Sequence, residues 1–169
     1  MAAIILEPVS TQSQIDTLCA IAKTVWHETY DDLLPPGQPD YMIEKFQSDH
    51  AVKEQMAREN YRYVLAKLGE AYVGFVGYAP RYQGQEEMYL SKAYILPQGR
   101  GQGVVGALFR LVEEETKKEG LSRVRLTVNK GNAHAKAVYE HYGYRTVEAV
   151  QSDIGGGYVM DDYVMVKAL

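Results

Sequence analysis

Apolar residues recur along the chain at two different spacings, and these predict an alternation of strands and helices. Residues 61–68 and 71–79 are rich in Tyr and Val and are separated by a Gly-Glu pair, the pattern of a β-hairpin. Apolar or alternating runs predict five further strands elsewhere in the chain. These cover residues 4–8, 87–96, 124–128, 144–150 and 158–166.

Apolar residues at helical spacing predict four helices between these strands. The first begins after Thr11, which forms a capping-box pattern with Gln14. Its apolar face comprises Ile15, Leu18, Cys19, Ala22, Val25 and Trp26. The second helix covers about residues 40–60, the third starts near Val104, and a short fourth ends at Gly143. The order β-α-α-β-β-β-α-β-α-β-β predicts a mixed α/β fold, with helices packed on one sheet of seven strands.

Composition favours one globular domain over residues 1–169, because 46% of the residues are apolar and 24% are charged. We expect neither a signal peptide nor a membrane span, since MAAIILEPVS lacks basic residues and no apolar stretch approaches ~18 residues. The single cysteine, Cys19, excludes an internal disulfide and favours a cytoplasmic location. The formal net charge of -4 argues against nucleic-acid binding.

A glycine-rich loop, QGRGQGVVGALF at residues 98–109, follows a predicted strand and opens a predicted helix. Such a turn can bind phosphate through free backbone N–H groups and the helix dipole. The G-x-G-x-x-G at Gly101, Gly103 and Gly106 is not a Rossmann fingerprint. Too few residues follow it for the remaining βα units, and the next strand carries no acidic residue. A P-loop is also excluded, because no Gly-Lys-Ser/Thr opens the helix.

Two motifs in this chain resemble the signatures of the GNAT superfamily of N-acetyltransferases. YILPQGRGQGV at residues 94–104, followed by Ala-Leu-Phe, matches the family's hydrophobic-x-Pro-x-x-Arg-Gly-x-Gly segment when Arg100 is aligned with the Arg. In this alignment Val105 stands where the family usually has a small residue. The second motif, NAHAKAVYEHYGY at residues 132–144, matches Asn-x-x-Ala-x-x-x-Tyr-x-x-x-Gly-Phe. The motifs occur in the family's order and at the expected separation.

The resemblance implies the GNAT fold, a mixed, mostly antiparallel, twisted sheet of about seven strands with helices on both faces. The fourth and fifth strands would splay apart, and acetyl-CoA would lie between them without any metal. The backbone of the fourth strand would pair with the pantetheine arm, and the amides of the glycine loop would hold the pyrophosphate. The residues thereby assigned to acetyl-CoA are Ala93, Tyr94, Ile95, Arg100, Gly101, Gln102, Gly103, Val104, Val105, Gly106, Asn132 and Tyr139.

The resemblance also assigns catalytic roles. Tyr139 matches the general acid that protonates the departing thiolate, although by spacing alone it would be a core aromatic residue. Asn132 would contact the pantetheine arm, cap the helix that follows it, or do both.

No general base is assigned by the sequence. Thr127 stands where some family members carry a Glu, and a Thr cannot act as a base. Six other residues are candidates, each more often a solvated surface group. They are His27, Glu28, Glu86, Glu87, Asp161 and Asp162.

These motifs favour an enzyme that transfers the acetyl group of acetyl-CoA directly to a primary amine, because the only thiol, Cys19, is far from them in sequence. WHETYDDLL at residues 26–34 and GGGYVMDDYVM at residues 155–165 are broadly similar to bacterial polyamine-acetylating members. Acidic residues in both segments suit a small cationic acceptor. They are Asp31, Asp32, Asp161 and Asp162.

Two alternatives remain open. One is a protein or peptide N-terminal acetyltransferase, although that branch usually carries the Glu that Thr127 replaces. The other is a non-catalytic module that binds acetyl-CoA. A homodimer through the last strand, residues 158–166, is also possible.

Overall fold

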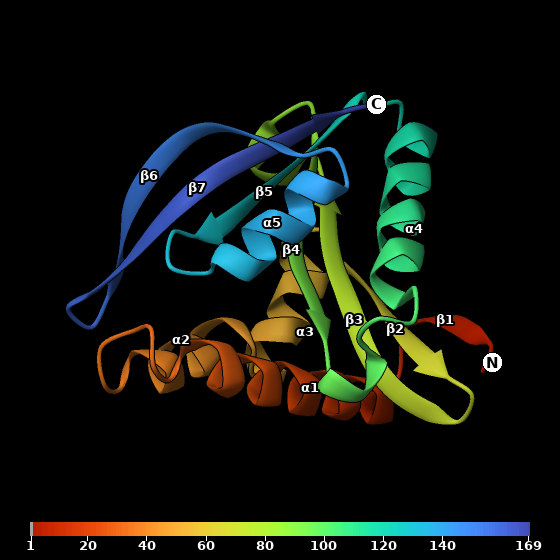
Figure 1. The fold of residues 1–169 in the computed structure, drawn as a ribbon, viewed down its shortest axis with the longest axis horizontal. Helices are drawn as coiled ribbons and strands as arrows, with labels where there is room; N and C mark the ends of the chain where they lie inside the picture. The colour runs from red at the N-terminus through yellow and green to blue at the C-terminus, as the bar shows by residue number, and fades with distance from the viewer. Residues whose placement is uncertain (1) are drawn as a thin grey trace.

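The computed structural model describes residues 2–169, which form a seven-stranded sheet covered by helices on both faces (Figure 1). The strands are β1 (Ile4–Pro8), β2 (Arg62–Leu68), β3 (Ala71–Pro80), β4 (Met88–Ile95), β5 (Arg123–Asn129), β6 (Arg145–Gly155) and β7 (Tyr158–Ala168). The helices are α1 (Gln12–Tyr30), α2 (Gln38–Phe46), α3 (Asp49–Arg58), α4 (Val104–Lys118) and α5 (Ala133–His141), with short 3-10 turns at Tyr82–Gly84 and Pro97–Gly99. Within residues 2–169 no helix is long and apolar enough to cross a bilayer.

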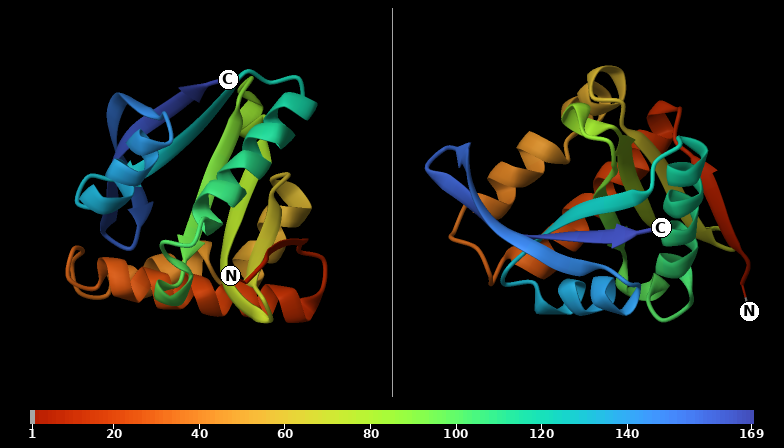
Figure 2. Two further views of the ribbon diagram at one scale, coloured as in Figure 1. Left: turned by 45° about the vertical axis from the view of Figure 1, so that its right-hand side comes forward. Right: turned by 90° about the horizontal axis from the view of Figure 1, so that it is seen from above.

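The sheet has the order β1-β2-β3-β4-β5-β7-β6, and all neighbouring strands are antiparallel except β4 and β5. The parallel pair is joined only at Met88↔Val124 and Tyr89↔Arg125, after which the two strands separate. Figure 1 shows their arrows pointing apart, and the left view of Figure 2 shows the β5–β7 part diverging from the rest of the sheet. The predicted sheet, including the splay, is therefore confirmed.

Each face of the sheet has its own core, because the strands carry apolar side chains on both sides. Helices α4 and α5 pack on one face, where Phe109 and Leu126 are among the buried residues. Helices α1 and α3 pack on the other face around Leu18 and Phe75. A third cluster joins α1 and α2 to the β6–β7 hairpin.

The predicted helix over residues 40–60 is wrong as one element, because the structure divides it into α2 and α3. Ser48 adopts an extended conformation, and its hydroxyl accepts a hydrogen bond from the amide of Ala51 at 3.2 Å. A Ser that caps one helix in this way interrupts the helix before it.

The C-terminal strands also differ from the prediction. Strand β6 was predicted to end at residue 150, but it extends to Gly155. The prediction was too short because β6 is a mostly exposed edge strand, whose sequence lacks apolar alternation. Strand β7 lies between β5 and β6, and both of its edges are paired from Asp162 to Val166. Backbone pairing between two copies through residues 162–166 is therefore blocked, the outer strands of the sheet are β1 and β6, and a homodimer through the last strand stays a prediction.

Candidate active site

The separation of β4 from β5 opens a cleft with a volume of ≈ 1450 Å³. Residues of both strands line it, together with residues of α1, α2, the glycine loop, α5 and the β6–β7 hairpin. The β4 edge beyond Tyr89 has no partner strand on this side. Its backbone groups are therefore available to an extended ligand arm, as in strand addition.

A β-bulge shapes this part of β4. The register with β3 shifts between Gly77, which pairs with Lys92, and Tyr78, which pairs with Leu90, so that Ser91 is the extra residue. The Ser91 hydroxyl is fixed by a hydrogen bond from the Tyr61 hydroxyl at 2.8 Å. Bulges of this kind bend a strand and re-aim its backbone groups, and here the bulge lies where β4 leaves β5.

The glycine loop forms a tight turn at one end of the cleft. Gly101 and Gly103 have φ of +72° and +83°, the left-handed region that glycine tolerates best. Helix α4 starts at Val104, and its first intrahelical bond runs from the Ala107 amide to the Gly103 carbonyl at 3.1 Å. The preceding amides of the first turn lack intrahelical partners. A Cβ placed on Gly101 would meet no protein atom within 4 Å, so the space outside the turn is open. These features fit an anion such as a pyrophosphate.

Ten of the twelve residues assigned to acetyl-CoA line the cleft. They are Ala93, Tyr94, Ile95, Arg100, Gly101, Gly103, Val104, Val105, Asn132 and Tyr139. The other two, Gln102 and Gly106, lie outside it: Gln102 donates a hydrogen bond to the Gln98 carbonyl at 2.8 Å, and Gly106 is buried against the Tyr142 hydroxyl. Val105 is half-buried against the core, so its larger side chain does not fill the turn.

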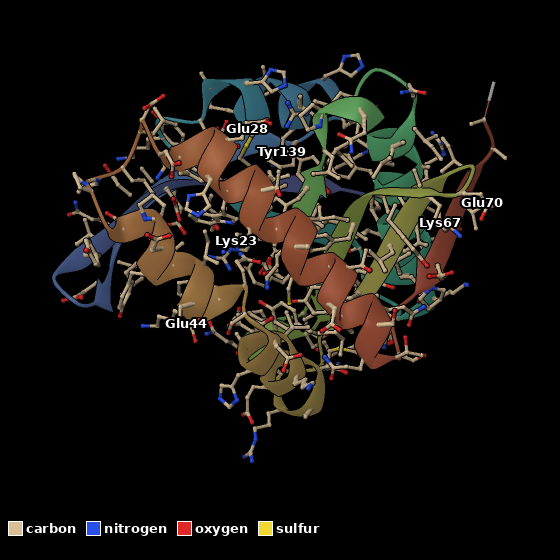
Figure 3. The ribbon with its side chains drawn as sticks, turned by 90° about the horizontal axis from the view of Figure 1, so that it is seen from below. Lys23, Glu28, Glu44, Lys67, Glu70 and Tyr139 are labelled. Carbon is tan, nitrogen blue, oxygen red and sulfur yellow. The ribbon has the colours of Figure 1, made fainter. Side chains whose placement is uncertain are left out.

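Arg100 contacts the protein on two sides. Its guanidinium donates to the Ile95 carbonyl at 3.2 Å and forms an ion pair with Glu28 at 2.5 Å. The pair joins the glycine loop to the C-terminal part of α1, where Figure 3 labels Glu28. Glu28 also lines the cleft, but it is engaged by Arg100 and is therefore a poor base.

Asn132 uses both ends of its side-chain amide. Its oxygen accepts from the Ala135 amide at 3.2 Å and so caps α5, which confirms the helix-cap prediction. Its nitrogen donates to the Tyr30 hydroxyl at 3.2 Å. Asn132 therefore fixes α5 against α1 across the cleft, and its contact with pantetheine stays a prediction.

Tyr139 projects from α5 beside the cleft and is labelled in Figure 3. Its ring stacks on Phe109 with 5.8 Å between centroids and meets the edge of Tyr144 at 5.9 Å. Tyr139 is half-buried, and among residues 2–169 no group forms a hydrogen bond with its hydroxyl, which is therefore free to bond to a ligand in the cleft. Burial raises the pKa of Tyr139, so the phenol stays protonated at neutral pH and can donate a proton.

Four of the six candidate bases lie outside the cleft, namely Glu86, Glu87, His27 and Asp161. Glu86 and Glu87 precede the paired end of β4, where they form ion pairs with Arg81 at 3.3 Å and Arg123 at 3.5 Å. His27 is bonded to Asp31 at 2.8 Å. Glu86 is exposed, whereas Glu87 is buried and its second carboxylate oxygen, Oε2, has no partner among residues 2–169. None of the four residues lines the space between β4 and β5.

The two adjacent acidic residues of β7 have opposite surroundings. Asp161 lies outside the cleft and forms an ion pair with Lys130 at 2.9 Å. Asp162 lines the cleft and is only 6% exposed. Burial is the main cause that raises the pKa of Asp162 to about 6, and the charge of Asp161 adds to it. Thr127 also lines the cleft, on the neighbouring strand.

Lys92 is a cleft residue that the sequence patterns did not single out. It is 4% exposed, and its ammonium group donates to the Phe46 carbonyl at 2.5 Å and to Gln55 Oε1 at 3.1 Å. It also lies over the Tyr63 ring, 5.2 Å from the centroid. Burial lowers the pKa of Lys92 to about 7. The sequence did hold a signal for this residue, because a lysine stands in the middle of MYLSKAYI, an otherwise largely apolar strand.

Solved structures share this architecture. A PaiA N-acetyltransferase from Thermoplasma acidophilum, in complex with coenzyme A, aligns over 99% of both chains with a TM-score of 0.79 and 19% identity. A ribosomal-protein-alanine N-acetyltransferase from Brucella melitensis aligns over 98% of this chain and 99% of its own, with a TM-score of 0.70 and 20% identity. A protein from Elizabethkingia anophelis with acetyl-CoA bound has a TM-score of 0.66 and 13% identity over 98% of both chains. At these identities the likeness establishes the fold.

Sequence comparison gives the family. Proteins of Mycobacterium tuberculosis and Mycobacterium bovis described as uncharacterized N-acetyltransferases are 35% identical over 95 residues, which is 56% of this chain. The match spans 60% of the length of these relatives. The sequence model of the acetyltransferase (GNAT) family matches residues 25–144, a segment that runs from α1 through the glycine loop to the end of the second motif. The chain therefore belongs to the acetyltransferase (GNAT) family.

Proposed function

We propose that the protein transfers the acetyl group of acetyl-CoA to a primary amine of a small, polyamine-like molecule. The observation that carries this proposal is the cleft between β4 and β5, which has the glycine turn at one end and Tyr139 on its wall. Family membership supports the same chemistry.

Acetyl-CoA supplies the acetyl group as a thioester, and the residues of the cleft suit its parts. The amides at the start of α4 would hold the pyrophosphate, beside open space at Gly101. The unpaired edge of β4 at Ala93, Tyr94 and Ile95 would pair with the pantetheine arm. Tyr139 would give its proton to the thiolate that leaves.

Direct transfer to the amine is favoured over an acetyl-enzyme. Cys19 packs in the core between α1 and the sheet, away from the cleft, and burial raises the pKa of its thiol. A thiol in this state is a poor nucleophile. We therefore propose that the amine attacks the thioester without a covalent intermediate on the protein.

The lining of the cleft supports a small cationic acceptor. Asp162 contributes a buried carboxylate, and Trp26 and Tyr30 contribute aromatic faces that attract organic cations. Lys92 and Arg125 line the same cleft, so we expect an acceptor with one or two ammonium groups and not a long polycation. We propose that the enzyme is cytoplasmic.

We also propose that the chain can form a homodimer. Analytical ultracentrifugation would measure this self-association.

The test is an assay of free thiol released from acetyl-CoA with a panel of polyamines, amino acids, aminoglycosides and peptides with free N-termini. Turnover with a short polyamine supports the proposal. Turnover only with peptides would show that the protein is an N-terminal acetyltransferase. Tight binding of acetyl-CoA in calorimetry without acetylation of any amine would identify a binding module and refute the enzymatic proposal.

A further inference from the structure

Asp162 lies on the side of β7 that faces the cleft. In the β5–β7 pairing it is opposite Asn129, and two positions further along Val164 is opposite Thr127. Side chains alternate along a strand, so Asp162 shares its face with Asn129 and Thr127, both of which line the cleft. Tyr163, between them in the chain, points to the other face and packs with the α4–α5 core.

The carboxylate of Asp162 has no partner in the described part of the chain, and its oxygens are not fully enclosed, so they are open to the cleft. No group among residues 2–169 forms an ion pair or a hydrogen bond with it, although the residue is only 6% exposed. The nearby cation, Lys130, is already bonded to Asp161 at 2.9 Å. A buried and unpaired carboxylate destabilises a fold, so its presence in a cleft indicates a role other than stability.

Two phenols lie near both Asp162 and Tyr139. The charge of Asp162 contributes to the raised pKa of Tyr30, from α1, and to that of Tyr89, from β4. The same two tyrosines contribute to the raised pKa of Tyr139. Asp162, from β7, and Tyr139, from α5, both line the cleft, and Tyr30 and Tyr89 line it as well.

We propose that Asp162 is the general base that removes a proton from the acceptor amine, directly or through one water molecule. The inference rests on the proposed function. In the balanced step, the amine nitrogen bonds to the acetyl carbon and the carbon–sulfur bond breaks. The ammonium group loses two protons in all. Asp162 takes the first, which frees the nitrogen lone pair, and later releases it to solvent. Tyr139 protonates the departing thiolate, and the second proton of the nitrogen, lost as the tetrahedral intermediate collapses, restores the phenol.

The other candidate bases are excluded by their positions. Glu86, Glu87 and His27 lie outside the cleft. Glu28 lines the cleft but is held by Arg100. Among these candidates, Asp162 is the carboxylate that lines the cleft and has no partner among residues 2–169.

The charged and titratable groups around Asp162 define its pH dependence. They are Asp161 and Lys130 at the same end of β7, with Tyr30 and Tyr89 from the opposite wall. Burial raises the pKa of Asp162 to about 6, so the carboxylate is ionised, and able to accept a proton, above that pH. We therefore expect kcat/KM for an amine acceptor to fall below about pH 6 in the wild-type protein.

The test compares Asp162→Asn with Asp161→Asn, which removes the neighbouring carboxylate outside the cleft. At pH 7 we expect Asp162→Asn to lower kcat by about 10²–10⁴-fold, the usual contribution of a general base, with acetyl-CoA affinity within about twofold of wild type. Asp161→Asn should lower kcat by less than about threefold, because the Asp161 carboxylate only forms an exposed ion pair with Lys130 outside the cleft. The difference in kcat between wild type and Asp162→Asn should become smaller as the assay pH approaches the pKa of the amine, because the amine is then already deprotonated in solution.

Three results would overturn the inference. The first is a kcat of Asp162→Asn equal to that of wild type, and the second is an equal loss of kcat in both variants. The third is a difference in kcat between wild type and Asp162→Asn that does not become smaller as the pH rises. Circular dichroism checks that both variants fold, and Asp162→Ser replaces Asp162→Asn if the amide is not tolerated. If the wild-type protein acetylates no amine, the proposed function and the inference fail together; if only the variant comparison fails, the proposed function stands.

Discussion

Replacing Gly101 with alanine tests whether the turn before α4 holds the pyrophosphate of acetyl-CoA. Gly101 has φ +72°, and an added Cβ would meet no protein atom within 4 Å. The substitution therefore costs only the left-handed backbone conformation, about 1–2 kcal/mol. In a domain of this size that lowers Tm by roughly 2–8 °C.

Gly120 is a matched control at the other end of α4. Its φ is +73°, and a Cβ there would also meet nothing within 4 Å. It lies after the C-terminus of the helix and not on the cleft. Gly120→Ala should therefore lower stability by the same amount as Gly101→Ala, within about 0.5 kcal/mol, without affecting a ligand.

The assay is calorimetric titration of each variant with acetyl-CoA. A methyl group at Gly101 would keep a phosphate away from the amides of the turn, and one lost hydrogen bond to a charged group is worth about 1.5–3 kcal/mol. We therefore expect Kd to rise about 10- to 150-fold for Gly101→Ala and by less than about twofold for Gly120→Ala. Equal affinity in the two variants would refute the assignment of the turn, whatever the stability measurements show.

Three further variants test other parts of the cleft. Tyr139→Phe should lower kcat by about 10²-fold in the thiol assay. Acetyl-CoA affinity and Tm should be nearly unchanged, because the hydroxyl forms no hydrogen bond with any group of residues 2–169. Unchanged turnover would show that Tyr139 is not the acid. The folded-state pKa of Lys92 is lowered from 10.5 to about 7, so between these values the unfolded chain binds more protons and wild-type stability rises with pH. In urea unfolding, the free energy of unfolding of the wild type should rise by roughly 3 kcal/mol from pH 7 to 9.5 relative to that of Lys92→Met. A difference between the two proteins that does not change with pH would contradict this. Glu28→Gln should change stability by less than about 1 kcal/mol, but calorimetry should find acetyl-CoA bound about threefold more tightly, since a negative charge beside the predicted pyrophosphate site is removed; weaker binding would show that the Glu28 ion pair positions Arg100.

The fold was predictable where local patterns and tertiary structure agree. The capping box at Thr11, the hairpin of β2 and β3 and the glycine at the start of α4 act through neighbouring residues, and each appears as expected. The break at Ser48 was missed, because a serine is tolerated inside a helix and acts as a cap only when the chain turns there. Strand β6 was predicted too short, because an exposed edge strand needs no apolar alternation.

The cleft was predictable in part for the same reason. The glycine turn and Tyr139 each belong to a contiguous motif, so both could be predicted from the sequence alone. Lys92 was missed, because its burial depends on α2 and α3, whose Phe46 carbonyl and Gln55 side chain accept its hydrogen bonds. Contacts between elements so far apart in sequence leave no short pattern to find.

Asp161 and Asp162 show why the sequence alone could not predict which of two adjacent acidic residues faces the cleft. In a strand with one exposed face, alternation would indicate which of two adjacent residues points inward. Strand β7 is covered on both faces near this point, so Val164 and Met165 are consecutive and both are buried. The β5–β7 pairing instead sets the side, since it runs without a shift from Arg123↔Ala168 to Asn129↔Asp162. Moving β7 by one residue would place Asp161 on the cleft face and Asp162 on the other, so the position of the proposed base depends on a register that only the assembled sheet defines.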